Sequence, residues 1–485
     1  MRRSGRDAAD GSQRRGRMTH RTLAARLAAA LADELAPRVP ERTPGQAWGV
    51  FDGERLVRVH GEGDAARDPG GTAFRIASCT KSFTAAAALL LADDGVLDLD
   101  EPLAEALDVP LRILGDAEHG GDHGGGPAPT VRDALAMRAG FPTDDPWADR
   151  QESLDDAAFA RMLGAGVRTI WPAGIRFEYS NLGYAIVGRI IGLRAGMPYR
   201  RVVETRLLEP LGLTGTGFEA TATAIRGHRR GPDGWEQLPF SGPGAFSPIG
   251  GLFSTVADLT RWAGALAGSD AAGVLPDGLG ERMQRPETRV VDGPAGAGEW
   301  YGLGLTIRTD PAGRRLIGHS GGYPGFAARM EWEAGSRVGA VAFENAGYTG
   351  LAIPVRAAFD AVLPPTAGEW RSPDAPGYPA WPETVAAAER VRDALAGGAL
   401  PDRALLDDCV DADAPLDRRA SALAELIAEI GGVEELGGLE HRTPAHAAWV
   451  MRGPRGGIRC ELLMTPLAET RVQRLHLALE QPTAG

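Results

Sequence analysis

The chain has 485 residues, of which 43% are hydrophobic and 24% charged, and its formal net charge is −12. A chain of this length and composition exceeds one average globular domain, so we expect one large domain and a smaller one. The acidic balance excludes partners that are bound through phosphates, namely nucleic acids and anionic membrane surfaces, and favours a small-molecule substrate.

The cysteines Cys79, Cys409 and Cys460 have neither CxxC nor Cys/His spacing. This pattern predicts no disulfide framework and no zinc site, and it fits a reducing compartment. Cys79 adjoins a candidate nucleophile, but a buried structural thiol is the simpler interpretation. No pattern in the sequence calls for a cofactor or a metal.

The N-terminal region is polar before it becomes helical. Residues 1–17 are charged, contain Gly and Ser and lack an apolar period, so we expect a disordered extension. The uncharged run from Leu27 to Ala32 is shorter than the roughly 7 to 15 apolar residues of a secretory signal core, which favours an amphipathic surface helix and a cytoplasmic location. No later stretch approaches the roughly 20 apolar residues of a membrane span.

A hairpin and a buried helix follow in the chain. Residues 47–60 alternate apolar and polar side chains around Asp52-Gly53, which predicts a β-hairpin. Ser78 and Lys81 then stand three residues apart, and an Ala/Leu run follows them as far as Gly95. The spacing predicts that both side chains share one helix face at the start of a core helix with a glycine C-cap.

The pair Ser78 and Lys81 suggests nucleophilic chemistry. A serine needs a neighbour that takes its proton, and a lysine can do so when burial lowers its pKa. Lys81 is the only lysine among the 52 basic residues, so every other positive side chain is an arginine, which cannot act as a base. An ordinary helix start with a surface lysine is the alternative, since a lone Ser-x-x-Lys match is common.

The middle of the chain begins with a glycine-rich stretch, residues 115–129. His119 and His123 lie there among acidic residues and could be imagined as metal ligands, but glycines give them no fixed geometry, so we predict a flexible insert. Residues 130–140 then predict a Thr-capped helix that ends at Gly140. Residues 244–269 predict a scaffold helix capped by Ser254 or Thr255.

Tyr179-Ser180-Asn181 lies between a Pro/Gly turn and a helix expected over residues 182–196. A phenol beside an ammonium can be held ionised or can shuttle a proton, so Tyr179 beside Lys81 is a candidate general base for Ser78 and general acid for the leaving group. The Asn181 amide is suited to hold Lys81 and a substrate carbonyl. A structural Tyr followed by an Asn helix cap is the alternative.

Residues 300–308 and 314–326 predict two adjacent strands, and the second carries His319-Ser320-Gly321. The same stretch contains Gly318-His319-Ser320-Gly321-Gly322, which matches the nucleophile elbow G-x-S-x-G and would make Ser320 the nucleophile. An elbow needs a helix directly after its serine. Gly321-Gly322-Tyr323-Pro324-Gly325 is a very poor helix start, which argues against this alternative.

Taken together, Ser78-Cys79-Thr80-Lys81, Tyr179-Ser180-Asn181 and His319-Ser320-Gly321 resemble the three ordered motifs of the serine β-lactamase and penicillin-binding family. The nearest branch is that of class C β-lactamases with the related D-alanyl-D-alanine carboxypeptidases, D-aminopeptidases and esterases. The third motif departs from the Lys-Thr-Gly of β-lactamases, because His319 is largely neutral near pH 7 and supplies no fixed charge for a β-lactam carboxylate.

The resemblance implies an α+β fold for residues 18–365, in which an antiparallel sheet flanked by helices stands beside a helical lobe. It implies a Ser78 acyl-enzyme on a small ester or amide substrate, with the N–H groups of Ser78 and Gly322 as oxyanion hole. The alternative function is a β-lactamase or a penicillin-binding sensor that is acylated with little turnover.

The C-terminal part begins with a Pro-rich linker, residues 366–384. Residues 385–485 predict a small α+β accessory domain with helices over 385–400 and 416–430 and two strands joined near Pro466. It carries no catalytic constellation. Shaping the mouth of the active site and mediating dimerisation remain equal alternatives for its role, and the sequence leaves the oligomeric state open.

Overall fold

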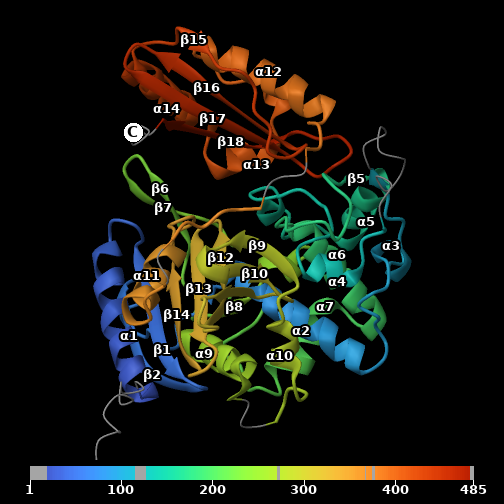
Figure 1. Ribbon diagram of the computed structural model, residues 1–485, viewed down its shortest axis with the longest axis vertical. Coiled ribbons are helices and arrows are strands. Elements are labelled where there is room, and N and C mark those ends of the chain that lie inside the picture. Colours follow the sequence, from blue (N-terminus) through green and yellow to red (C-terminus); the bar gives the residue numbers. More distant parts are fainter. Residues whose placement is uncertain (1–18, 115–126, 270–272, 366–367, 374–376, 481–485) are drawn as a thin grey trace, which may run out of the picture.

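Figure 1 shows the computed structural model, which describes residues 19–114, 127–269, 273–365, 368–373 and 377–480. The extension 1–17 and the imagined metal ligands His119 and His123 lie outside the described residues.

The largest element is an antiparallel sheet with the strand order β2-β1-β14-β13-β12-β11-β10-β9. The expected hairpin is confirmed: β1 pairs with β2, and Gly53 takes a left-handed φ of 62° in the turn between them. The strands of the sheet are β1 (Gly45–Asp52), β2 (Arg55–Gly63), β9 (Thr288–Asp292), β10 (Gly298–Tyr301), β11 (Thr306–Thr309), β12 (Arg315–Tyr323), β13 (Phe326–Glu333) and β14 (Val338–Glu344).

Helices cover both faces of this sheet. Successive strand residues point to opposite faces, so Val50 packs with α1 (His20–Leu35) and α11 (Ala352–Val362), whereas Phe51 belongs to the core on the other side. That second core includes α2 (Thr80–Asp93) and α9 (Val256–Gly264). The expected N-terminal surface helix is thus α1, which buries one leucine stripe and exposes the opposite face.

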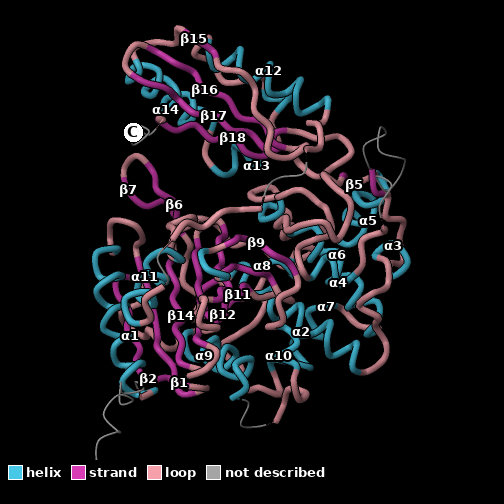
Figure 2. The backbone as a smooth tube through the Cα atoms, in the orientation of Figure 1, coloured by secondary structure: helices cyan, strands magenta, loops and turns pink. Residues whose placement is uncertain are grey.

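A helical lobe stands beside the sheet, as Figure 2 shows with the helices at its right. Its centre is the contact between α2 and α6 (Asn181–Ala195), both buried along most of their length. The expected α+β class is confirmed by this sheet and lobe. The other helices of the lobe are α3 (Leu103–Ala106), α4 (Val131–Leu135), α5 (Asp156–Ala165), α7 (Tyr199–Val203) and α8 (Ser247–Gly250), and α10 (Leu279–Met283) contacts α2.

Three expected elements are shorter than the sequence suggested. The Thr130-capped helix ends at Leu135 and not at Gly140, because Met137 takes a left-handed φ of 55°. Residues 300–308 form two strands, β10 and β11, rather than one, because the chain turns at Gly304 with a φ of 72°. Likewise, the expected strand 314–326 ends at Tyr323 before a turn into β13.

The C-terminal elements form a separate layer at the top of Figure 1. The strands β15 and β16 were not predicted, and the first helix begins earlier than expected, inside the expected linker 366–384. The sheet order is β15-β16-β17-β18, with β15 (Glu435–Leu436), β16 (His446–Gly453), β17 (Gly456–Met464), β18 (Val472–Leu479), α12 (Pro382–Ala396), α13 (Asp408–Asp413) and α14 (Leu416–Ile430).

This layer is attached to the lobe by ion pairs and backbone hydrogen bonds. Arg168 forms a bidentate pair with Glu383, and its N–H donates to the carbonyl of Pro466. The remaining small sheets pair β3 (Phe74–Arg75) with β8 (Phe253–Ser254), β4 (Ile113–Leu114) with β5 (Val167–Arg168) and β6 (His228–Gly231) with β7 (Gly234–Gln237). None of the helices in the described ranges is both long and apolar enough to cross a membrane.

The turn at Gly304 generates a stability prediction. A Cβ there would lie 2.6 Å from the backbone oxygen of Lys81, whereas one at Gly313, with a similar φ of 80°, would have no atom within 4 Å. Both alanine variants carry left-handed strain of about 1–2 kcal/mol, and only Gly304→Ala adds overpacking of about 1–3 kcal/mol. Urea unfolding should show that difference. Equal losses in the two variants would contradict the close approach.

Candidate active site

Ser78 lies in the short 3-10 turn η2 (Ala77–Cys79) that leads into α2, and it is partly exposed while both neighbours are fully buried. Ala77 has a φ of 47°, a strained conformation for a residue with a side chain. Strand β12 passes directly behind, since a Cβ on Gly321 would lie 2.4 Å from the carbonyl oxygen of Ile76. The turn therefore presents the Ser78 hydroxyl while its backbone is fixed between β12 and α2.

Lys81 is fully buried, and its predicted contact with Ser78 is confirmed. The Lys81 Nζ donates to Ser78 Oγ at 3.1 Å, to Asn181 Oδ1 at 2.6 Å and to the carbonyl oxygen of Ile249 at 2.9 Å. Three acceptors use the three ammonium hydrogens. Burial lowers the pKa of Lys81 to about 8, against the opposing charges of nearby aspartates.

Tyr179 lies over the same amine, with Lys81 Nζ 5.0 Å from its ring centroid. Burial and the charge of Asp145 raise the pKa of Tyr179 well above its usual value, while a hydrogen bond with Ser78 opposes that increase. The phenol therefore stays protonated where Lys81 titrates. This direction of the Tyr179 pKa argues against the ionised phenol, and the role of Tyr179 in proton transfer remains a prediction.

Asn181 begins α6, and two aspartates hold its amide. Its Nδ2 donates to Asp144 Oδ1 at 3.0 Å and to Asp145 Oδ1 at 2.5 Å, so both amide hydrogens are used. Asp144 also accepts the N–H groups of Asn181 and Leu182, both at 2.8 Å, and the hydroxyl of Ser180. The expected interaction of Asn181 with Lys81 is confirmed, but the amide has no free hydrogen for a substrate carbonyl.

The aspartates around this amide were not among the predicted site residues. Asp144, Asp145 and Asp149 lie within the six residues 144–149, and that density of acidic residues was the available signal. Asp144 is fully buried, and desolvation, with repulsion from Asp145, raises its pKa to about 7. Ser180 at the N-cap of α6 makes no capping bond, so Asp144 supplies the cap from a distant loop.

His319 lies on β12 beneath Tyr179 and is buried. Its Nδ1 is 2.5 Å from the carbonyl oxygen of Ser320 and must donate there, so Nε2 accepts from the Tyr301 hydroxyl at 2.9 Å. Burial, with the positive charge of Lys81, lowers the pKa of His319 to about 3. The imidazole is neutral, and both of its nitrogens are occupied.

The elbow alternative is wrong. Ser320 lies within β12, paired with Arg329 on β13, and a turn and another strand follow it rather than a helix. Gly322, the expected oxyanion donor, lies two residues further along β12, close to the ring of Tyr348. Its role remains a prediction.

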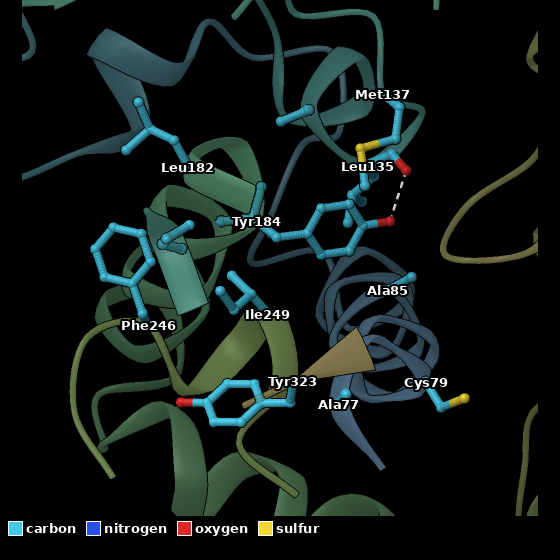
Figure 3. Close-up of a cluster of buried hydrophobic side chains, with 14 of the residues drawn as sticks. Ala77, Cys79, Ala85, Leu135, Met137, Leu182, Tyr184, Phe246, Ile249 and Tyr323 are labelled. Atoms are coloured by element: carbon cyan, nitrogen blue, oxygen red, sulfur yellow. Dashed lines mark hydrogen bonds between the residues drawn. The ribbon is translucent and has the colours of Figure 1, made fainter. Parts of the chain in front are cut away.

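Figure 3 shows the apolar packing around the nucleophile turn, including Ala77, Cys79 and Ile249. The Tyr184 hydroxyl there donates to the carbonyl of Leu135 at 2.7 Å. Burial raises the pKa of Cys79 to about 12, and its thiol donates to the carbonyl of His319. The interpretation of Cys79 as a buried structural thiol is confirmed.

A cavity of about 380 Å³ opens beside Tyr179 and His319. Its lining combines aromatic and aliphatic side chains with charged ones, among them the buried ion pair of Arg329 with Glu331. The apolar walls are Phe177, Val290, Trp300, Tyr301, Ile307, Leu316, Ala352 and Ile353.

Comparisons with known proteins found a matching family model and several relatives. A family model described as Beta-lactamase matches residues 25–362. The D-aminopeptidase of Gluconobacter oxydans is 30% identical over 321 residues, which are 62% of this chain and 56% of that protein. The D-alanyl-D-alanine-carboxypeptidase/endopeptidase AmpH of Escherichia coli is 26% identical over 326 residues, which are 61% of this chain and 78% of that protein.

Solved structures share the fold. The octameric penicillin-binding protein homologue from Pyrococcus abyssi has a TM-score of 0.56 and 20% identity, and the match covers 93% of this chain and 99% of that one.

The buried cap on α6 generates a second stability prediction. Asp144→Ala leaves two helix N–H groups without their acceptor inside the protein, whereas Asp155→Ala removes one exposed capping bond at α5. We expect a loss of about 3 kcal/mol or more for Asp144→Ala and about 1 kcal/mol for Asp155→Ala, measured by urea unfolding. Similar losses would show that water replaces Asp144 at no extra cost.

Proposed function

Since this chain is a hydrolase that belongs to the beta-lactamase family, we propose that Ser78 attacks the carbonyl carbon of a small ester or amide and forms an acyl-enzyme. The observation that carries the proposal is the 3.1 Å contact between Ser78 Oγ and the amine of a fully buried lysine. A buried amine with a pKa of about 8 can take up a proton near neutral pH, as activation of a serine requires.

In the proposed acylation, the neutral Lys81 amine takes the proton of Ser78 Oγ as that oxygen bonds to the carbonyl carbon. The N–H groups of Ser78 and Gly322 stabilise the oxyanion. Tyr179 donates its proton to the leaving group as the bond to carbon breaks, and Lys81 returns a proton to the phenolate. The pKa directions favour Lys81 over Tyr179 as the first base, because the phenol ionises only at higher pH.

Deacylation follows the same path in reverse with water as nucleophile. Tyr179 takes a proton from the attacking water as it passes its own proton to the neutral Lys81 amine. The bond between the acyl carbon and Ser78 Oγ then breaks, and the Lys81 ammonium returns a proton to that oxygen. The acid and the hydroxyl of Ser78 are the products.

The substrate side of the proposal rests on His319 and on the cavity. A neutral imidazole with both nitrogens occupied offers no fixed charge to a β-lactam carboxylate, which favours esters, amides and D-amino-acid derivatives. The names of the D-aminopeptidase and carboxypeptidase relatives support the same classes. Because Tyr179 protonates the leaving group, we assign the cavity beside it to that group.

The acyl-enzyme can be tested by intact-protein mass spectrometry with a p-nitrophenyl ester and with a β-lactam. We expect a transient adduct of the ester on Ser78, with turnover, and none in Ser78→Ala. Ser320→Ala is the matched control, because its hydroxyl lies in the neighbouring strand, and it should still form the adduct. A permanent β-lactam adduct without turnover would establish the alternative, a penicillin-binding sensor.

The proposed base predicts a pH dependence. Lys81 acts in its neutral form, so kcat/KM for an uncharged ester should rise as the pH increases through about 8 and level off above it. Lys81→Arg keeps the charge but cannot release a proton, and we expect a loss of about 10²–10⁴-fold. If kcat/KM stayed constant over a pH range of roughly 6 to 10, that result would contradict Lys81 as the base.

A further inference from the structure

Gln473 of β18 is a fully buried polar side chain of the C-terminal layer that reaches into the helical lobe. Its Nε2 donates to the carbonyl of Thr143 at 3.0 Å and to that of Met464 at 2.8 Å. Its Oε1 accepts the N–H of Trp147 at 3.3 Å. The Gln473 amide therefore forms hydrogen bonds with both ends of the segment 143–147, and both its nitrogen and its oxygen have partners.

The segment 143–147 carries the carboxylates of Asp144 and Asp145, which accept hydrogen bonds from the Asn181 amide. Asp144 and Asp145 lie between the two backbone groups that Gln473 binds, and they fix both hydrogens of the Asn181 amide. The carbonyl side of that amide then faces Lys81 Nζ. A continuous series of hydrogen bonds and covalent segments thus runs from the C-terminal sheet to the candidate base.

Nearby charges strengthen the same attachment. Arg150, at the end of the acidic run, lies 3.7 Å from Asp413 of α13. The thiol of Cys409 donates to the backbone carbonyl of Gln473, which holds β18 against α13. The C-terminal layer therefore meets the lobe at the segment that shapes the Lys81 environment.

We infer that Gln473 is a positioning residue for the active site, through which the C-terminal layer holds the segment 143–147 and thereby the Asn181 amide against Lys81. The inference rests on the proposed function of Ser78 and Lys81. It assigns to the C-terminal layer a part in catalysis that involves no contact with the substrate.

The unique lysine gives a readout that does not depend on activity. Because Lys81 is the only lysine, protein labelled with ¹³C at lysine Cε gives one side-chain signal, whose pH titration reports the environment of that amine. Gln473→Met keeps the side-chain volume and removes all three hydrogen bonds. Arg168→Met is the matched control, since the Arg168 side chain pairs with Glu383 and lies over the ring of Trp381 at the same interface, and neither partner belongs to 143–147.

We expect Gln473→Met to move the titration midpoint of Lys81 by about half a pH unit or more and to lower the acylation rate by about ten- to hundredfold, with a smaller change in KM. Arg168→Met should leave both the midpoint and the rate as in the wild type. Asp145→Asn should lower the midpoint, because the charge of Asp145 raises the pKa of Lys81.

A double variant tests the route. If Gln473 acts through the segment, Gln473→Met should have little further effect on the acylation rate in the Asp145→Asn background. Additive effects would overturn this route, as would a folded Gln473→Met protein with the wild-type Lys81 midpoint. A shifted midpoint in a protein that no ester acylates would support the positioning role and reject the proposed function, so the two failures are distinguishable.

Discussion

Burial of the Lys81 amine is the constraint on which the site depends. An ammonium removed from water is costly unless every hydrogen finds an acceptor, and here a hydroxyl, an amide oxygen and a backbone carbonyl supply them. Burial lowers the pKa of this amine and the neighbouring aspartates raise it. These opposing effects leave the pKa of Lys81 at about 8, close enough to neutral pH for the amine to exchange a proton.

The same constraint explains why the amine's neighbours are so heavily supported. Asn181 can turn its oxygen to Lys81 only while its amide hydrogens are accepted elsewhere, and Asp144 and Asp145 accept them. Those carboxylates lie in an irregular loop, so they need support of their own. Gln473 supplies it from the far end of the chain.

Local patterns anticipated much of the fold. The alternation around Asp52-Gly53 and the Ala/Leu run after Lys81 form the predicted elements, and the helix predicted over 182–196 is observed as Asn181–Ala195. The patterns failed at Met137 and Gly304, where the chain changes direction. At Gly304 the reason is tertiary, because the backbone of Lys81 leaves no room for a side chain there.

By itself the sequence determined that Ser78 and Lys81 are in contact, because their three-residue spacing brings the two side chains together once the helical turn forms. It also identified Tyr179, Asn181 and His319 as candidates, through their order along the chain. Only the tertiary structure decided what each could do, since hydrogen bonds from distant segments occupy the Asn181 amide and the His319 ring. Long-range burial and hydrogen bonding set protonation and orientation, and neither follows from local spacing.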